Sequence, residues 1–228
     1  MTTTDPNDPN AVFDHRALRL LMGIIAFSLP FATNGVSARP LASISASYYT
    51  EGHDFFIGML CAISTLLWAY NGHSSREKVA SKMAAIATLL VVIFPTSCEG
   101  CGVDIKSTIH YAAAVTVFGI LTYFCLGPFR EGTKGKKGKK GLRANLYLFC
   151  GSVMLLCLLI AGIAQLTRPA ETAASSITFW TETIALLAFG VAWIVAGKAI
   201  PALVDEDERL KLSLKQSTEL HLTKLQKA

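Results

Sequence analysis

Six apolar runs, separated by polar segments, constrain this chain more than any other feature. They cover residues 17–38, 54–71, 79–95, 108–128, 144–167 and 177–201. Each run is close to the ~20 residues that a helix needs to cross the hydrocarbon core of a bilayer. Only 16% of the residues are charged, while 52% are hydrophobic. We therefore expect an all-α polytopic membrane protein, a bundle of six transmembrane helices, with the first run retained rather than cleaved as a signal peptide.

The positions of the Lys and Arg residues predict the orientation of these helices. All but three of the 21 lie on one side of the predicted membrane, and the exceptions are Arg39, Lys106 and Arg168. By the positive-inside rule both termini are cytoplasmic. The connections 39–53, 96–107 and 168–176 then face outward. We divide the chain into a polar N-terminal segment (1–16), a six-helix transmembrane domain (17–201) and a charged, amphipathic cytoplasmic tail (202–228) that is suited to the membrane surface or to a partner helix of another membrane protein.

A polybasic segment, REGTKGKKGKKGLR at residues 130–143, connects the fourth and fifth runs on the cytoplasmic side. Its glycines oppose helix formation, so we expect a flexible loop. Each basic side chain beside a bilayer contributes roughly 1 kcal/mol of attraction to anionic headgroups. Nucleic acid is not an expected partner, because no aromatic side chains interleave the lysines. The predicted contacts with anionic lipid are Lys134, Lys136, Lys137, Lys139 and Lys140.

Polar and ionisable residues gather at the outer ends of three runs. His110 opens the fourth run, and Glu182 lies a few residues inside the sixth. A carboxylate inside the edge of a bilayer costs a few kcal/mol unless it faces a partner or water. We therefore expect Glu182 to hold one ring nitrogen of His110 and leave the other for a substrate, a proton or a metal, as a catalytic pair. A purely structural bond between the helices is the alternative.

The stretch SISASYYTEGHDFF, residues 43–56, forms the expected rim of this outward site. For His53 and Asp54, helix capping or solvation at the membrane interface is the favoured alternative. The serines of this stretch commonly form hydrogen bonds with the backbone of a loop. The candidate ligand-binding residues are Ser43, Ser45, Tyr48, His53 and Asp54.

Two of the six cysteines, Cys98 and Cys101, form a C-x-x-C motif in an outward connection. A local disulfide is the expected state on an oxidising side of the membrane. Half of a metal site is the alternative, although zinc normally needs two further ligands. The sequence identifies no cofactor and leaves the metal content open.

Aromatic residues near the cytoplasmic ends of the runs are expected at the membrane interface, where Trp and Tyr are enriched. These residues are Trp68, Tyr70, Tyr147 and Trp193.

The layout resembles the six-helix Frag1/DRAM/Sfk1 group and related bacterial families. The resemblance is carried by S-x-S-x-x-Y-Y followed by HDFFIGMLCAISTLLWAYNG, by IHYAAAVTVFGILTY and by FWTETIALLAFGVAW. It covers roughly residues 17–200. It implies a shared six-helix topology, with His110 and Glu182 at the positions of the group's His and Glu, and an association with lipid handling. The SCEGCG loop and the polybasic segment depart from the group.

Three functions of different classes follow from these features. The first is lipid-associated binding or organisation through an outward polar vestibule. The second is a membrane-embedded lipid-modifying enzyme that uses His110 and Glu182. The third is an accessory subunit of a membrane complex. A bacterial cytoplasmic membrane is the favoured location, and a eukaryotic endomembrane is the alternative.

Overall fold

A computed structural model describes residues 15–98, 101–167 and 176–205. These residues contain six α-helices: α1 (His15–Val36), α2 (His53–Ala69), α3 (Ser75–Ile93), α4 (Ile105–Phe124), α5 (Lys139–Thr167) and α6 (Ser176–Ala196). No strand occurs among the described residues. The 1–14 segment, the 168–175 connection with Arg168 and the tail from residue 206 lie outside the described residues.

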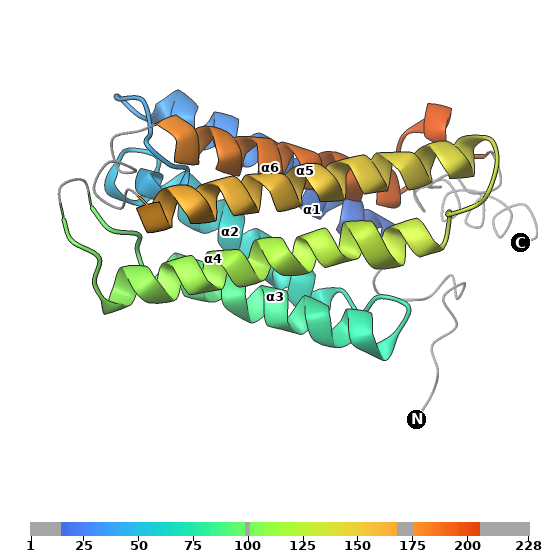
Figure 1. Ribbon diagram of the computed structural model, residues 1–228, viewed down its shortest axis with the longest axis horizontal. Coiled ribbons are helices and arrows are strands. Elements are labelled where there is room, and N and C mark those ends of the chain that lie inside the picture. Colours follow the sequence, from blue (N-terminus) through green and yellow to red (C-terminus); the bar gives the residue numbers. More distant parts are fainter. Residues whose placement is uncertain (1–14, 99–100, 168–175, 206–228) are drawn as a thin grey trace, which may run out of the picture.

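The helices follow one another around a closed ring. Each packs against its neighbours in sequence, and α6 returns to pack against α1. Successive helices run in opposite directions along the long axis of the bundle (Figure 1). One end of the bundle therefore carries the connections 37–52 and 94–104, and we call it the disulfide end. The other end carries residues 70–74, 125–138 and 197–205, and we call it the basic end.

Helix boundaries follow local sequence signals. The Ser74 hydroxyl caps α3 by accepting from the N–H of Glu77 at 3.2 Å and donating to its carboxylate at 3.1 Å. At the start of α4, Asp104 Oδ1 accepts from the Ser107 N–H and Ser107 Oγ accepts from the Asp104 N–H, which is a capping box. Both pairs satisfy N–H groups that the first turn of a helix leaves without partners.

The end of α4 shows what a proline does within a helix. Residues Cys125–Phe129 continue α4 as a π-helical turn that contains Pro128. Proline has no N–H to donate and crowds the preceding turn, so the regular hydrogen-bonding pattern of the helix shifts there.

Four of the helical segments are long and apolar enough to cross a membrane: α1, residues Ile105–Phe129, α5 and α6. The α2 helix is apolar but shorter, with 17 residues. The first half of α3 carries several charged side chains. The outer surface of α5 is apolar and includes exposed Phe149, Leu156 and Leu159. Such a surface suits lipid rather than water, and these segments indicate an integral membrane protein.

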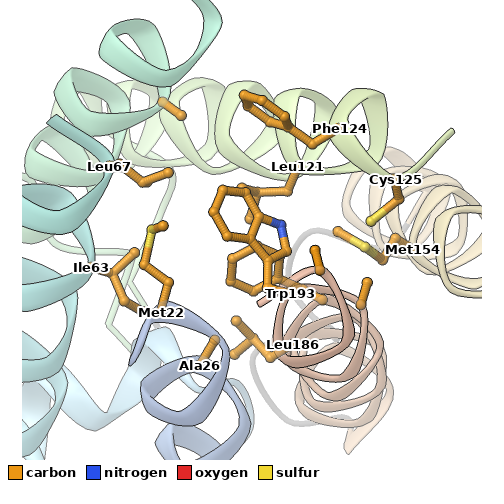
Figure 2. Close-up of a cluster of buried hydrophobic side chains, with 14 of the residues drawn as sticks. Met22, Ala26, Ile63, Leu67, Leu121, Phe124, Cys125, Met154, Leu186 and Trp193 are labelled. Carbon is orange, nitrogen blue, oxygen red and sulfur yellow. The ribbon is translucent and has the colours of Figure 1, made fainter. Parts of the chain in front are cut away.

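Buried hydrophobic side chains fill the centre of the bundle, with Trp193 among them (Figure 2). Trp193 of α6 is fully buried, and its ring lies 5.2–5.5 Å from the rings of Tyr70, Phe124, Phe129 and Phe189. Edge-on contacts of this kind add to the stabilisation from burial. The expectation that Tyr70, Tyr147 and Trp193 lie at the interface is therefore wrong for these residues, since all three are buried. Trp68 is exposed.

A buried cation lies beside this aromatic cluster. Arg19 of α1 is only 9% exposed, and its guanidinium donates twice to the Tyr70 hydroxyl, through Nε at 3.0 Å and through Nη2. It also donates to the Ala196 carbonyl at 3.4 Å and lies 4.9 Å from the Phe129 ring centroid. Hydrogen bonds and a ring face satisfy a guanidinium that the surrounding apolar side chains alone would leave unsolvated.

Two glycines set the close approach of α1 and α6. A Cβ added at Gly23 would lie 2.8 Å from the Gly190 carbonyl oxygen, and one added at Gly190 would lie 2.9 Å from the Gly23 carbonyl oxygen. Small residues at facing positions let two helix backbones come together, as is common in membrane proteins.

The polybasic segment is more ordered than its sequence predicts. The α5 helix begins at Lys139, so Lys139, Lys140 and Arg143 are helical despite Gly141. Lys139 Nζ donates to the Val204 carbonyl at 3.0 Å and to the Pro201 carbonyl at 3.5 Å. The prediction of a loop over all of 130–143 is wrong at Arg130 and Glu131, which are helical, and from Lys139 onward. Packing of α5 against its neighbours outweighs the weak helix propensity of one glycine.

Candidate functional site

The connection 37–52 folds over the disulfide end and packs against the start of α6. It contains a 3₁₀ helix, η1 (Ser45–Tyr49), and is tied to the first turns of α6 by two hydrogen bonds. The Phe179 N–H donates to the Ala42 carbonyl at 3.0 Å, and the Ile44 N–H donates to Glu182 Oε2 at 2.5 Å. The start of α6 therefore positions this connection.

Glu182 lies at the N-terminus of η1. Its carboxylate accepts from Ile44, the residue that caps this short helix. An oxygen acceptor beside the free N–H groups of a helix start satisfies donors that have no partner within the helix. This bond gives the carboxylate a partner near the apolar edge of the bundle. The partner is backbone, whereas the sequence analysis expected His110.

His110 also bonds to backbone. Its side chain is buried, and Nδ1 lies 2.8 Å from the carbonyl oxygen of Phe94, the residue that ends α3. A carbonyl only accepts, so Nδ1 carries the proton and the neutral ring has its lone pair on Nε2. His110 therefore satisfies a carbonyl at the end of α3 and retains one nitrogen that can accept a hydrogen bond or a proton.

A cavity of about 740 Å³ opens at the disulfide end, and we call it the vestibule. Both His110 and Glu182 line it, although among the described residues each bonds to backbone and not to the other. The remaining walls come from the connection 38–51, from residues 96–98 and from parts of α4, α5 and α6. The volume is large enough for a ligand the size of a lipid headgroup.

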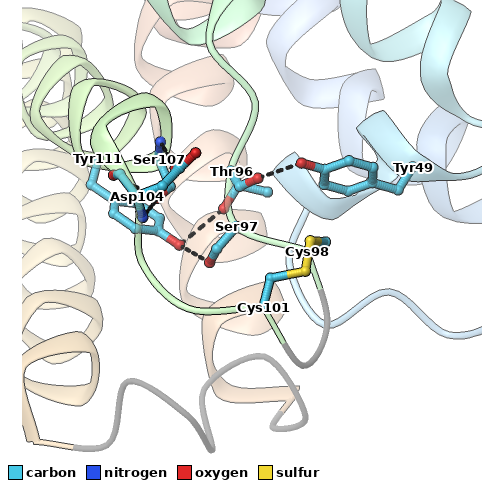
Figure 3. The surroundings of a disulfide bond; sticks show 8 residues. All are labelled: Tyr49, Thr96, Ser97, Cys98, Cys101, Asp104, Ser107 and Tyr111. Carbon is cyan, nitrogen blue, oxygen red and sulfur yellow. Dashed lines mark hydrogen bonds between the residues drawn. A yellow bond between two sulfur atoms is a disulfide. The ribbon is translucent and has the colours of Figure 1, made fainter.

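Hydroxyl groups form one wall of the vestibule, and Figure 3 shows their arrangement. The Tyr49 hydroxyl donates to the Thr96 carbonyl at 2.7 Å. The Tyr111 hydroxyl accepts from Thr96 Oγ1 at 3.1 Å and shares a 2.7 Å hydrogen bond with Ser97 Oγ. We call Tyr49, Thr96, Ser97 and Tyr111 the hydroxyl cluster. Burial raises the pKa of the Tyr49 phenol, so it remains a donor at neutral pH.

A disulfide joins Cys98 to Cys101 directly beside the hydroxyl cluster, with 5.2 Å between the two Cα atoms (Figure 3). Cys98 is half-buried and lines the vestibule, while Cys101 is exposed. The segment then enters α4 through the Asp104 cap. Hydrogen bonds from the backbone and hydroxyl of Ser107 lower the pKa of the Asp104 carboxyl.

The mouth of the vestibule carries charges of both signs. Arg39 and Glu51 both line it and are exposed. The Ala38 N–H donates to Glu51 Oε2 at 3.2 Å. Hydrogen bonds from its own backbone and from Ala38 lower the pKa of the Glu51 carboxyl, so it is ionised at neutral pH. Together with Glu182, these groups can meet a ligand that carries both a cation and an anion.

The structure places the five predicted rim residues in three positions: one lines the vestibule, one lines a smaller cavity and three line neither. Ser43 lines the vestibule, and its hydroxyl accepts from the Ala46 N–H at 2.9 Å. Ser45 lines a smaller neighbouring cavity of about 60 Å³, which Glu182 also borders. Tyr48, His53 and Asp54 do not line the vestibule. His53 Nδ1 lies 3.1 Å from the Asp54 carboxylate, whose side chain is 99% exposed, and the His53 ring packs on Tyr48.

Several vestibule residues were missed by the sequence analysis. Tyr111 follows His110 directly, and Ala114 lies one helical turn after His110 on α4. The helical spacing from His110 could therefore have predicted Tyr111 and Ala114 as neighbours of the site. Arg39 was treated only as an exception to the charge pattern. Thr96 and Tyr49 meet across a sequence separation of 47 residues, and only the folded chain brings them together.

The predicted lipid-contact lysines divide as well. Lys134, Lys136 and Lys137 are exposed at the basic end, while Lys139 and Lys140 are half-buried at the start of α5. Among the described residues, no group of three His, Cys, Asp or Glu side chains is arranged to hold a metal ion.

Comparison of the chain with protein-family models, with curated proteins and with solved structures finds no match. The function is therefore argued from the geometry of the vestibule.

Proposed function

We propose that this protein is a six-span membrane protein whose vestibule binds a phospholipid headgroup at the outer face. In this arrangement α2 and α3 cross the membrane with the other four helices, the basic end faces the cytoplasm and the disulfide end faces outward. The distribution of Lys and Arg supports this orientation. So does the disulfide, since such bonds persist on oxidising sides of membranes. A bacterial cytoplasmic membrane is the proposed location.

The vestibule is the observation that carries the proposal. A cavity of about 740 Å³ at the edge of an apolar bundle, with Arg39, Glu51 and Glu182 in its walls, combines charges of both signs with hydroxyl donors. A phosphoethanolamine headgroup has the matching chemistry. Its phosphate suits Arg39 and the hydroxyls, and its ammonium suits the carboxylates. The acyl chains would extend along the apolar outer surface of the bundle. The resemblance to a lipid-handling group agrees with this assignment.

The test measures binding of dihexanoyl phosphatidylethanolamine, a soluble short-chain lipid, to the purified full chain in detergent by calorimetry. We expect saturable binding to one site. Arg39→Ala should weaken it about tenfold, the effect of losing one charge-assisted hydrogen bond of ~1.5 kcal/mol. Lys106→Ala removes a basic residue of the disulfide end that does not line the vestibule, and it should leave affinity unchanged. Equal affinity of both variants and wild type would refute the assignment.

A lipid-modifying enzyme is the second candidate, and the position of His110 favours it. With Nδ1 donating to Phe94, Nε2 is the nitrogen that could act as a general base. His110→Asn retains a donor near the position of Nδ1 and removes Nε2. Loss of lipid turnover with retained binding would support the enzyme. If the wild-type protein binds the headgroup but does not turn the lipid over, the result would support a binding function without catalysis.

A further inference from the structure

The disulfide lies next to the hydroxyl wall of the vestibule. Cys98 follows Thr96 and Ser97 directly in the chain and itself lines the cavity. The Cys101 N–H donates to the Cys98 carbonyl at 3.0 Å, so a backbone hydrogen bond and the covalent bond hold the same two residues. Three hydrogen bonds to Tyr49 and Tyr111 depend on where Thr96 and Ser97 lie. The disulfide therefore closes the turn that directly follows this wall in the chain.

The two cysteine residues differ in exposure. Cys101 is exposed, while Cys98 is half-buried in the vestibule wall. A thiolate from solution reaches an exposed sulfur more readily than a covered one, and access is one determinant of exchange rate. Attack on Cys101 makes Cys98 the leaving group, so the released thiolate would lie in the wall of the vestibule.

We propose that Cys98–Cys101 is a thiol-exchange site through which small-molecule thiols lower the affinity of the vestibule for its headgroup. A thiolate attacks the sulfur of Cys101, forming a mixed disulfide while the bond to Cys98 breaks. Cys98 leaves as a thiolate and takes a proton from water. A second thiol attacks the mixed disulfide, which yields reduced Cys101 and the oxidised disulfide of the reagent. Two thiols thereby supply the two electrons that reduce the protein.

Reduction changes the vestibule in two ways. It removes the covalent restraint on the segment that carries Thr96 and Ser97, so the hydroxyl wall samples more arrangements and is less preorganised. It also places a thiol group in the cavity wall at Cys98. If the binding-competent arrangement falls to about a tenth of the population, affinity falls about tenfold. This inference rests on the proposed headgroup-binding function.

The experiment uses the purified full chain and dihexanoyl phosphatidylethanolamine as the probe. Affinity is measured for the oxidised protein, after treatment with dithiothreitol, and after reoxidation. Cys98→Ala/Cys101→Ala removes the site, and Cys61→Ala serves as the matched control because Cys61 is a free cysteine on α2. In parallel, brief treatment with glutathione followed by alkylation and peptide mass spectrometry identifies which cysteine carries the adduct.

We expect dithiothreitol to weaken binding about tenfold in the wild type and in Cys61→Ala, and reoxidation to restore it. The double variant should bind weakly with or without dithiothreitol, and the glutathione adduct should lie on Cys101. Equal binding by oxidised and reduced protein would overturn this inference and leave the proposed function standing. Absence of probe binding in both states would overturn both. An adduct confined to Cys98 would refute the assigned direction of attack.

Discussion

The hydrogen bond from the Ile44 N–H to Glu182 ties the connection 37–52 to α6. Its removal should loosen the connection around η1. Glu182→Ala deletes the hydrogen bond that Oε2 accepts from the Ile44 N–H at 2.5 Å. A buried N–H left without its acceptor costs about 1–3 kcal/mol. Since Phe179 still donates to Ala42, we expect local opening around η1 and not unfolding of the bundle.

Amide hydrogen exchange followed by mass spectrometry measures this opening directly. A loss of about 1–3 kcal/mol corresponds to roughly 5- to 100-fold faster exchange of the amides around η1, because 1.4 kcal/mol is a factor of ten. Glu182→Gln keeps an acceptor without the charge and should give a smaller acceleration.

Thr178→Ala is the matched control, since it removes another vestibule-lining side chain of α6 and leaves the Glu182–Ile44 bond in place. Exchange at η1 that is unchanged in Glu182→Ala, or accelerated equally in the control, would refute the reasoning.

Three further predictions concern the core and the helix caps. Trp193→Ala removes a fully buried side chain and should lower the free energy of unfolding by about 3–5 kcal/mol, measured by denaturant titration in detergent; a loss below 1 kcal/mol would contradict the central packing role. Tyr70→Phe removes the hydroxyl that accepts twice from Arg19 and should cost about 1.5–3 kcal/mol. The double variant Arg19→Met/Tyr70→Phe should recover part of that stability, because the buried charge is removed together with its partner. If the losses of stability in the two single variants simply add in the double variant, the coupling between Arg19 and Tyr70 is refuted. Because the folded pKa of Asp104 is lowered, its cap should stabilise α4 above the ordinary pKa and weaken as the pH falls through the lowered value; the protection of the amides at the start of α4, measured relative to their intrinsic exchange rates at each pH, should then fall at low pH in the wild type but not in Asp104→Asn.

The membrane character of the chain could be predicted because it depends on local composition. The predicted run 54–71 corresponds to α2 at His53–Ala69, and the run 177–201 corresponds to α6 at Ser176–Ala196. A long apolar run in lipid has few alternatives to a helix, so its length and hydrophobicity largely decide its structure. The C-x-x-C spacing favoured a disulfide in the same local way.

The burial of aromatic residues could not be predicted in this way. Trp193 and Trp68 both lie near the basic end of a helix, yet Trp193 is fully buried and Trp68 is 57% exposed. Which side of a uniformly apolar helix faces the bundle depends on the neighbouring helices. The burial of Arg19 could not be predicted either, because it depends on hydrogen bonds to Tyr70 and Ala196, which lie far from Arg19 in the sequence.

The local pattern of residues is enough to predict that apolar helices alternate with polar connections, and that ionisable residues gather at one set of helix ends. What those residues contact follows only from the way the helices pack. The tertiary structure placed His110 and Glu182 on one vestibule but bonded each to backbone, and it left His53 and Asp54 outside. The physical reason is that helix formation and membrane burial depend on neighbouring residues and on solvent, whereas a contact such as Tyr49 with Thr96 joins segments 47 residues apart and depends on how every intervening helix packs.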